Sequence, residues 1–329
     1  MIIILSLKSP SGKATDAVDT VNKNVFKKID INDVNFVETK GFFNKIILMY
    51  KLKPDFLLGI GNIEEIFFVL LKPISVRYVI VWHTLLKKTK TWLIRKFLFN
   101  SVEFVIAVSY CAGTTIKNLF PNIKVFTALN GVDTDFFNEN KKNKDYLSKK
   151  YSISFDKPIV LFVGALFKRK RPDIFISIAR KFDNANFILI GRKDKENFLS
   201  DTKNIPNFKW IPFMDRNDIA TMMASSDIFL FPSINEPCAA VIPEAMSSGL
   251  IVLLSKSCGN RELIDDGKNG FLVDVGDNEV IDFLDHLKNL FNDDNFRKNI
   301  SQNARKKCED QLNWLAVSSV YKKIFYENL

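Results

Sequence analysis

The sequence predicts an α/β protein that contains two doubly wound parallel sheets. At 329 residues, the chain exceeds the ~250 to 300 residues at which one hydrophobic core stops growing, so we expect two domains. Short apolar runs alternate with helical stretches nearly throughout, which is typical of parallel sheets covered by helices on both faces. Hydrophobic residues make up 47% of the chain and charged residues 26%, an ordinary globular balance.

In the first half of the chain, apolar runs predict strands that end at small or polar residues. These strands cover residues 1–7, 56–60, 78–82 and 104–108, with another near Val125, and residues 14–28 have helical spacing. The chain leaves the predicted sheet at Gly61, His83 and Ser109, where the carboxyl ends of parallel strands meet and ligands bind. Residues 130–133, Asn-Gly-Val-Asp, predict a tight turn.

His83 is a candidate ligand-binding residue because it comes directly after a predicted strand. An imidazole at the carboxyl edge of a sheet can donate a hydrogen bond to a ligand hydroxyl or accept one from it. A histidine that bonds only to the backbone would give the same sequence pattern. Both interpretations stay open on the sequence alone.

A polar and charged segment separates the two halves of the chain. We predict a first domain over residues 1–140, a linker over 141–157, a second domain over 158–310, and a last helical segment over 311–329 that we consider able to pack back toward the first domain. In the second half, strands are predicted over residues 158–163, 187–190, 208–211, 228–231, 251–254 and 270–273, and helices over 277–291 and 313–326.

A basic loop follows the first strand of the second half. It runs from Gly164 to Arg171 and carries four basic side chains, and Pro172 then opens a helix at its first position. Free backbone N–H groups at a helix start and nearby cations converge well on phosphate. A solvated basic turn would look similar. The loop lacks the GxxxxGK[ST] pattern of nucleotide triphosphatases.

A second loop with two carboxylates follows the strand at 228–231. Pro232 ends this strand, residues 233–237 form a polar turn, and residues 239–246 restart as a helix that Gly249 can close. Glu236 therefore lies at the carboxyl edge of the sheet, and Glu244 lies in the following helix. Carboxylates there can bind hydroxyls or transfer a proton, although a solvated glutamate is an equally ordinary reading.

The formal charge of +10 is concentrated in the first half of the chain. Residues 1–150 hold 23 Lys and Arg against 13 Asp and Glu, whereas the remainder is neutral. Between residues 87 and 99, basic side chains interleave with aromatic and aliphatic ones, as in a helix that lies on an anionic membrane. A core helix with a solvated basic rim is the alternative. The residues of this predicted membrane or acceptor surface are Lys87, Lys88, Lys90, Trp92, Arg95 and Lys96.

Other partner classes receive less support from the sequence. The basic segment is not accompanied by a zinc-finger, helix-turn-helix or RNA-binding signature, so nucleic acid is not a predicted partner. The four cysteines form no CxxC pair, and we predict no structural zinc site. No apolar run reaches the ~18 residues of a membrane span, and residues 1–7 lack the basic start of a signal peptide.

Collinear motifs over residues 78–275 carry a resemblance to one enzyme family. They comprise His83, Val108-Ser109 and residues 130–133, then Phe162-Val163-Gly164 through Lys170, Ile190-Gly191, residues 224–233, Glu236 through Glu244, and Gly259, Glu262, Asp266-Gly267 and Asn269-Gly270. In this order the set resembles the motifs of the family-4 retaining glycosyltransferases (GT4), the group 1 type. That family has the GT-B fold, two facing Rossmann-like domains with a cleft between them.

The resemblance implies a role for each matched residue. Glu236 would face the donor sugar, His83 would reach the same sugar, and both would be catalytic. Lys170 would hold the donor diphosphate with help from Arg169, Glu244 would bond the ribose hydroxyls, and Glu262 would stabilise the loop near the phosphates. The implied donor-binding set is Gly164, Arg169, Lys170, Gly191, Glu244 and Glu262, with Gly12 and Lys13 as minor contributors.

The chain departs from the family pattern at three places. Ala165 stands where the family has an arginine, which makes Arg169 a candidate substitute. Cys238-Ala239 replaces a Phe-Gly pair, and the first loop offers Ser11-Gly12-Lys13 in place of paired glycines.

The function that the resemblance implies is a metal-independent, retaining transfer of a sugar from a nucleotide-sugar, UDP favoured over GDP, and no cofactor is expected. The basic first domain favours a lipid-diphosphate-linked saccharide as acceptor, in the biosynthesis of cell-surface polysaccharide such as O-antigen, lipopolysaccharide or capsule. The protein would then be cytoplasmic and peripheral on the inner face of the cell membrane. A GT-B nucleotide-sugar epimerase and a non-catalytic nucleotide-sugar-binding subunit are the alternatives, and the sequence makes no prediction of oligomeric state.

Overall fold

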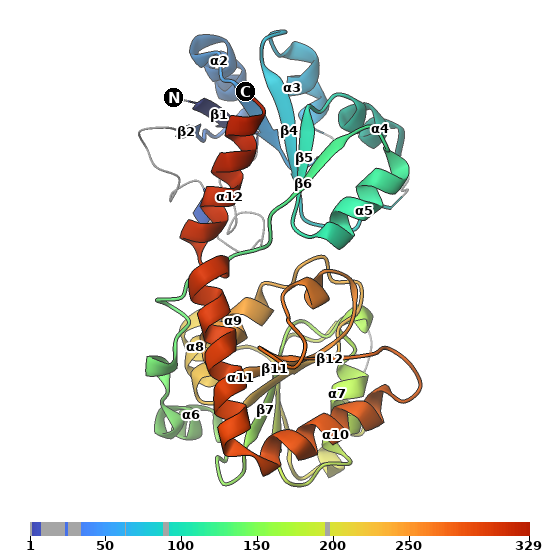
Figure 1. Ribbon diagram of the computed structural model, residues 1–329, viewed down its shortest axis with the longest axis vertical. Coiled ribbons are helices and arrows are strands. Elements are labelled where there is room, and N and C mark those ends of the chain that lie inside the picture. The colour runs from blue at the N-terminus through green and yellow to red at the C-terminus, as the bar shows by residue number, and fades with distance from the viewer. Residues whose placement is uncertain (1, 8–23, 26–33, 63, 88–91, 195–197) are drawn as a thin grey trace. The chain divides into compact units, whose positions relative to one another are not determined.

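The computed structural model describes residues 2–7, 24–25, 34–62, 64–87, 92–194 and 198–329. The chain divides into two compact units (Figure 1). Unit 1 consists of Met1–Gly131 and Trp314–Leu329, and unit 2 consists of Val132–Asn313. Each unit contains a six-stranded parallel sheet with helices on its faces, so the predicted fold class is confirmed.

The sheet of unit 1 has the strand order β2-β1-β3-β4-β5-β6. Its strands are β1 (Ile2–Ser6), β2 (Val34–Val37), β3 (Phe56–Gly59), β4 (Arg77–Trp82), β5 (Phe104–Ala107) and β6 (Lys124–Thr127). The helices of this unit are α2 (Phe42–Leu52), α3 (Glu65–Leu71), α4 (Trp92–Asn100), α5 (Tyr110–Leu119) and α12 (Trp314–Glu327). The strand order reverses between β1 and β3, and such a switch point is where open α/β sheets bind ligands at their carboxyl edge.

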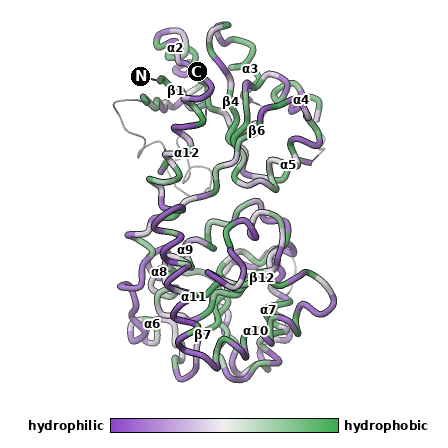
Figure 2. Tube along the Cα trace, viewed as in Figure 1, coloured by the Kyte–Doolittle hydropathy of each residue, from purple (hydrophilic) through white to green (hydrophobic). Residues whose placement is uncertain are grey.

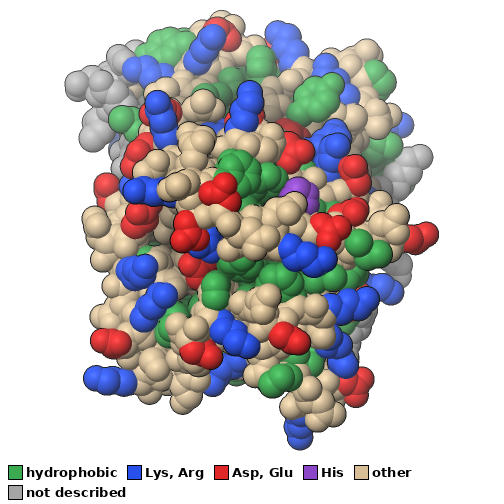
Figure 3. Space-filling view, turned by 60° about the horizontal axis from the view of Figure 1, so that its bottom comes forward, with side chains coloured by type: hydrophobic (Ala, Val, Ile, Leu, Met, Phe, Trp, Pro, Cys, Tyr) green, Lys and Arg blue, Asp and Glu red, His purple; other side chains and the backbone are tan. Residues whose placement is uncertain are grey.

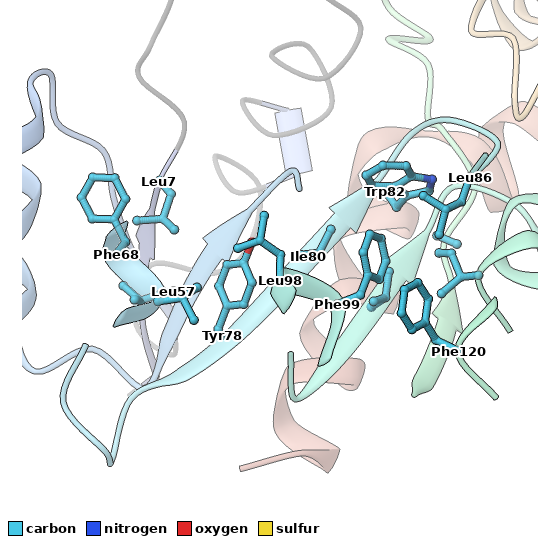
Figure 4. Packing of buried hydrophobic residues seen from close by; sticks show 14 of the residues in the cluster. Leu7, Leu57, Phe68, Tyr78, Ile80, Trp82, Leu86, Leu98, Phe99 and Phe120 are labelled. Carbon is cyan, nitrogen blue, oxygen red and sulfur yellow. The ribbon is translucent and has the colours of Figure 1, made fainter. Parts of the chain in front are cut away.

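The sheet of unit 1 has a hydrophobic core on each face, because successive strand residues point to opposite sides. Phe56 of β3 faces α12, where its ring lies 5.1 Å from that of Phe325. Leu57 points the other way, into the core formed with α2, α3, α4 and α5 (Figure 4). In that second core Phe99 and Phe120 stack at 5.1 Å. The C-terminal helix is therefore an integral part of unit 1.

The sheet of unit 2 has the strand order β12-β11-β10-β7-β8-β9. Its strands are β7 (Ile159–Val163), β8 (Asn186–Ile190), β9 (Phe208–Ile211), β10 (Ile228–Phe231), β11 (Ile251–Ser255) and β12 (Phe271–Val273). Its helices are α6 (Lys144–Tyr151), α7 (Pro172–Ala179), α8 (Arg216–Ala224), α9 (Val241–Ser247), α10 (Glu279–Asn292) and α11 (Asp294–Lys307). The switch point of this sheet lies between β7 and β10. Figure 2 shows the strands of both units as hydrophobic segments, as expected of strands buried on both faces.

The segment 141–157, predicted as a linker, instead lies within unit 2. Leu147 of α6 is fully buried, and the Tyr146 hydroxyl donates a hydrogen bond of 2.8 Å to the Asp218 carboxylate of α8. Asn143 caps α6 by accepting a hydrogen bond from the Tyr146 backbone N–H. The polar composition of this segment did not predict these contacts, because they depend on one apolar residue and on partners about 70 positions away.

The tight turn predicted at Asn130-Gly131 is wrong. Residues 128–131 run without a turn, and Val132 then bridges to Asn313. A Cβ atom at Gly131 would lie 2.6 Å from the Trp314 ring, so a close approach to α12 accounts for the glycine. The predicted helix at 14–28 lies outside the described residues except for positions 24 and 25.

Within the described residues, none of the helices is long and apolar enough to cross a bilayer. On the face of the molecule drawn in Figure 3, basic and acidic side chains intermingle.

Candidate functional site

Three loops of unit 2 meet at the carboxyl edge of its sheet, beside the switch point between β7 and β10. They follow β7, β10 and β11, and backbone hydrogen bonds join them. The Ile234 N–H donates to the Arg169 carbonyl at 2.9 Å, and the Gly259 N–H donates to the Glu236 carbonyl at 3.0 Å. The loop after β10 therefore holds the loops on both sides of it in a fixed position.

Gly191 allows two of the strand ends to approach closely. A Cβ atom at this position would lie 1.9 Å from the carbonyl oxygen of Gly164. The Gly164 N–H donates to the Ile190 carbonyl at 2.9 Å, which fixes the exit of β7 against the exit of β8. Gly191 thus allows the loops after β7 and β8 to approach closely, and the roles of Gly164 and Gly191 in donor binding stay predictions.

Three other side chains of the site contact the Glu236 carboxylate. The Glu236 side chain is buried, with the whole residue 5% exposed. The Oε1 atom accepts hydrogen bonds from Arg169, from Lys170 at 2.9 Å and from the Ser233 hydroxyl at 3.0 Å. Burial alone would raise the pKa of Glu236, but the charge of Lys170 and the hydrogen bonds from Arg169 and Lys170 lower it below its usual value. The carboxylate therefore stays ionised at neutral pH.

The two cations beside Glu236 differ in exposure. The Lys170 side chain is 14% exposed and its ammonium lies 4.7 Å from the centre of the Phe231 ring, whereas the Arg169 side chain is 47% exposed. Burial lowers the pKa of Lys170, and the charge of Glu236 opposes this shift. One carboxylate faces two cations here, and the surplus positive charge suits an anionic ligand.

Arg171, the last basic residue of the loop, has a different partner. Its guanidinium makes a two-pronged ion pair with Glu279 at the start of α10, with one N–O distance of 2.8 Å. Glu279 is 1% exposed and also accepts a hydrogen bond from Ser255 at the end of β11. Arg171 has a left-handed backbone conformation with φ of 53°, which is unfavourable for residues other than glycine. The ion pair therefore holds the end of the basic loop against α10.

Glu244 lies in α9 and is separate from the Glu236 cluster. It is half-buried, and among the described residues no side chain donates a hydrogen bond to its carboxylate. Burial raises the pKa of Glu244 to about 7, although the charge of Arg216 lowers it. This carboxylate is able to accept hydrogen bonds from a ligand.

The loop after β11 contributes a short 3-10 helix, η4 (Cys258–Glu262). Glu262 is half-buried at its end. Asn260 is fully buried, and within the described part of the chain its side-chain amide has no hydrogen-bond partner. Sequence reasoning did not single out Asn260, Ser233, Ser255 or Glu279, since their positions matter only after the loops have come together.

The remaining predicted site residues belong to unit 1. His83 directly follows β4, at the carboxyl edge of that sheet, and is half-buried. In α4, the Arg95 guanidinium lies 5.8 Å from the centre of the Trp82 ring, and the Trp92 ring packs on Phe120 at 5.5 Å. Lys87 and Lys96 are exposed. The predicted residues Gly12, Lys13, Lys88 and Lys90 lie outside the described residues.

The structure thus brings the predicted site residues Glu236, Arg169 and Lys170 into direct contact. Within the described ranges, no cluster of three or more His, Cys, Asp or Glu side chains is placed to hold a metal ion.

Known proteins resemble this chain in sequence. Residues 143–307 match the sequence profile of the family described as glycosyl transferases, group 1. The spore coat protein SA of Bacillus subtilis is 29% identical over 250 residues, which are 68% of this chain and 66% of that protein. The UDP-Gal:alpha-D-GlcNAc-diphosphoundecaprenol alpha-1,3-galactosyltransferase of Escherichia coli is 28% identical over 60% of this chain and 53% of its own length. The chain thus spans between about half and two thirds of the length of these relatives.

A solved structure resembles the whole chain. The structure of Anabaena Alr3699/HepE in complex with UDP and glucose superposes with a TM-score of 0.77 at 18% identity, over 99% of this chain and 100% of that one. At this identity the likeness concerns the fold, and the GT-B fold class predicted from the sequence is confirmed.

Proposed function

The chain belongs to the glycosyl transferases, group 1, and on this premise we propose that it is an enzyme that transfers a sugar from a nucleotide-sugar donor to a saccharide acceptor. The observation that carries the proposal is the contact of Lys170 and Arg169 with the buried carboxylate of Glu236 at the switch point of unit 2. This arrangement offers cations for a diphosphate and an ionised carboxylate for a sugar hydroxyl, side by side.

The donor diphosphate binds at the basic loop. Lys170 and Arg169 both contact the phosphates, and together with Ser233 they keep Glu236 in place. In the reaction, the bond between the sugar C1 and the diphosphate oxygen breaks, and the acceptor hydroxyl oxygen bonds to C1. The proton of that hydroxyl passes to the departing diphosphate or to water. Negative charge grows on the diphosphate as the bond breaks, and the fixed cations stabilise it.

The Glu236 carboxylate accepts a hydrogen bond from a hydroxyl of the donor sugar and orients it, and a catalytic role is proposed for His83 of unit 1 as well. Glu244 accepts hydrogen bonds from the ribose, and Glu262 stabilises the phosphate-binding loop. Because Lys170 and Arg169 supply the positive charge, we propose that the transfer is metal-independent and uses no cofactor, and that it retains the configuration at C1. These glutamates are not a glycosidase acid and nucleophile pair.

We favour UDP as the nucleotide. The similar Escherichia coli protein is named for a UDP-Gal donor, and the structure of similar fold contains UDP with glucose. The same relative is named for an acceptor on diphosphoundecaprenol, which supports a lipid-diphosphate-linked saccharide as the acceptor class and a step in cell-surface polysaccharide biosynthesis. The exposed Lys87 and Lys96 support peripheral contact with the anionic inner face of the cell membrane.

A donor panel tests the proposed function. The purified protein is incubated with UDP-, GDP-, ADP- and TDP-sugars, and donor hydrolysis and transfer are measured for wild type, Glu236→Gln and Glu309→Gln. Glu309 is a matched control because it is an exposed glutamate of unit 2, far in sequence from the three loops. We expect activity with one donor, loss of at least about 100-fold in Glu236→Gln, and wild-type activity in Glu309→Gln.

Two outcomes would contradict the proposal. The absence of turnover with every donor, together with thermal stabilisation by a nucleotide, would indicate a non-catalytic binding protein. Equal turnover in wild type and Glu236→Gln would show that the Glu236 carboxylate does not contribute to the reaction.

A further inference from the structure

Unit 1 contains a cavity at the switch point of its own sheet. The cavity has a volume of about 680 Å³, within the usual range for small-molecule sites. Leu7, which directly follows β1, and Asn62, which follows β3, both line it. Because the switch point of this sheet lies between β1 and β3, the cavity is where the topology favours a ligand. His83 follows the adjacent strand β4 at the same edge.

The wall of this cavity is mainly apolar. Leu7 and Phe68 form its inner part and belong to the hydrophobic core of unit 1, where Figure 4 shows them side by side. Phe42 bridges to the outer part, with its ring 4.9 Å from Phe68 and 6.0 Å from Phe67. Phe42, Phe67 and Leu71 are 40%, 56% and 44% exposed, so they form the rim. A ligand that fills the cavity would contact aromatic and aliphatic carbon.

Of the polar residues that line the cavity, Lys45 and Glu65 are buried and bind groups of the wall, whereas Asn62 and Glu64 are exposed. The Lys45 ammonium donates a hydrogen bond of 2.6 Å to the Leu7 carbonyl. The Glu65 carboxylate accepts hydrogen bonds from the N–H groups of Ile60 and Gly61 and from the Tyr78 hydroxyl. These hydrogen bonds stabilise the wall, and the two side chains do not need hydrogen bonds from a ligand. The buried part of the cavity is therefore suited to a hydrocarbon.

The surface around the rim is also apolar. Phe43, Ile47 and Tyr50 follow one another at helical spacing on α2 and are 77%, 61% and 53% exposed. On α3 and just beyond it, Leu70 and Ile74 are 63% and 101% exposed. An apolar face turned to solvent on neighbouring helices indicates a binding surface, since a soluble monomer rarely exposes such a patch.

The two helices form one continuous surface, which we call the α2–α3 surface. The Tyr50 hydroxyl donates a hydrogen bond of 2.6 Å to the Leu71 carbonyl, and the rings of Phe42 and Phe67 meet near the other end. The exposed side chains at its border are those of Lys40, Lys51 and Lys53, together with Glu38 and Glu64. Apolar side chains with lysines at their border are complementary to an anionic bilayer.

We propose that the α2–α3 surface lies on the membrane and that the cavity takes the hydrocarbon chain of a lipid-linked acceptor. This inference rests on the proposed function and deepens it, because it assigns the lipid part of the acceptor to a site separate from the basic helix α4. The chain enters past the rim residues from the bilayer, and the saccharide end extends along the carboxyl edge toward His83. Each methylene group that leaves water for the cavity adds about fourfold to the affinity.

A blocking variant with a matched neighbour tests the cavity directly. Leu71 lines the cavity, whereas Leu70 is adjacent, similarly exposed and does not line it. We expect Leu71→Trp to fill the cavity and Leu70→Trp to leave it open. The probe is cis-parinaric acid, a fatty acid whose fluorescence rises in an apolar site. Binding should weaken at least tenfold in Leu71→Trp, equivalent to about two lost methylene contacts, and stay at the wild-type level in Leu70→Trp.

A second pair of variants guards against a folding defect in the first. Phe67→Arg places a charge at the rim, and Phe43→Arg places the same charge on the nearby surface outside the cavity. Only Phe67→Arg should reduce parinarate binding. Equal binding in both members of either folded pair would overturn the inference.

A kinetic comparison connects the cavity to the acceptor. The acceptors are N-acetylglucosamine diphosphate carried on an undecaprenyl chain and on a hexyl chain. We expect Leu71→Trp to raise KM at least tenfold for the long chain and less than twofold for the short one, with the donor KM unchanged. If wild type transfers to neither acceptor but Leu71→Trp loses parinarate, the proposed function fails and the cavity stands. If transfer occurs with the same KM change for both chains, the cavity inference fails alone.

Vesicle flotation tests the surface. Wild-type protein should float with phosphatidylglycerol vesicles, and the double variant Phe43→Ser with Ile47→Ser should stay at the bottom of the gradient. Size-exclusion chromatography is run beside it. If wild type forms a dimer that this variant dissolves, and if flotation is unchanged, the α2–α3 surface is a contact with a second copy of the chain and the membrane assignment is wrong.

Discussion

The switch points of the two sheets share a topology but differ in chemistry. In unit 2, the loops after β7 and β10 bring Arg169 and Lys170 onto the buried carboxylate of Glu236. In unit 1, Leu7 after β1, Asn62 after β3 and Phe68 of α3 line a mainly apolar cavity. Parallel sheets therefore create the place for a ligand in both units, while the loop side chains decide which ligand binds. We propose on this basis that unit 2 binds a charged nucleotide and unit 1 a hydrocarbon.

The largest effect is expected from removing the buried cation of unit 2. Lys170→Ala should lower kcat/KM by about 1,000-fold, because it removes a fixed positive charge from the diphosphate and leaves Glu236 without one of its partners. Lys168→Ala is the control, since Lys168 belongs to the same short 3-10 helix (Lys168–Lys170) and is exposed. Steady-state kinetics with the best donor measures both. Comparable losses in the two variants would show that the loop acts only through its total charge.

The next effect concerns the anchor of the basic loop. Glu279→Gln should weaken nucleotide binding by about tenfold, because Arg171 loses its partner and its left-handed backbone is no longer held. Adding Arg171→Gly should restore binding, since glycine adopts the left-handed backbone conformation without strain. Calorimetric titration with UDP measures the single and double variants. A double variant as weak as Glu279→Gln would show that Glu279 does not act through the conformation of Arg171.

A smaller effect depends on pH through Glu244. Its pKa of about 7 means that the carboxylate form is lost as the pH falls from 8 to 6. UDP affinity of wild type should therefore fall over this range more steeply than that of Glu244→Gln, and the variant should bind about tenfold more weakly at pH 8. Comparing the two proteins cancels the titration of UDP itself. Parallel pH profiles would exclude Glu244 from the nucleotide site.

The same group affects stability with the opposite sign. A raised carboxyl pKa favours the protonated folded state, so the contribution of Glu244 to stability is present below pH 4.5 and is lost as the pH rises through about 7. Glu244→Gln should therefore be more stable than wild type at pH 8, by on the order of 2 kcal/mol after allowing for partial exposure, and equal to it near pH 4. Denaturant unfolding at the two pH values measures this. Equal stability at pH 8 would mean that burial does not penalise the charge.

The smallest effect is expected on the exposed surface of unit 1. Phe43→Ser should change the free energy of unfolding by less than about 0.5 kcal/mol, because the side chain is 77% exposed and contributes little to the core. UDP binding in unit 2 should be unaffected. A large loss of stability would indicate that Phe43 supports the fold, and the contrast between the two units would weaken.

The sequence predicted the framework of the fold well, for a clear physical reason. A strand buried on both faces is a continuous apolar run, and β7, β10 and β11 are runs of this kind. Glu236 and Lys170 could be found because each follows such a strand within a few residues and belongs to a family motif. Local spacing predicted that both residues follow a strand end of the sheet, whereas their roles came from the family resemblance and stay predictions.

Features that depend on distant partners could not be predicted. Arg171 and Glu279 are 108 positions apart, and neither the ion pair nor the left-handed backbone has a local signal. The cavity of unit 1 depends on how α2 and α3 flank the strand ends, which residue periodicity does not specify. The prediction of a linker over residues 141–157 was wrong for the same reason, because the hydrogen bond between Tyr146 and Asp218 forms only in the folded unit. Whether α4 carries the membrane contact stays a prediction.

The central claim is that the basic loop of unit 2 binds the diphosphate of a nucleotide-sugar. Isothermal titration of wild type, Lys170→Ala and Lys168→Ala with UDP tests it most directly. We predict saturable binding to wild type, binding about 10- to 100-fold weaker in Lys170→Ala, and wild-type binding in Lys168→Ala, because a buried charge-assisted contact is lost only in the first variant. Equal affinity of all three proteins for UDP would contradict the account.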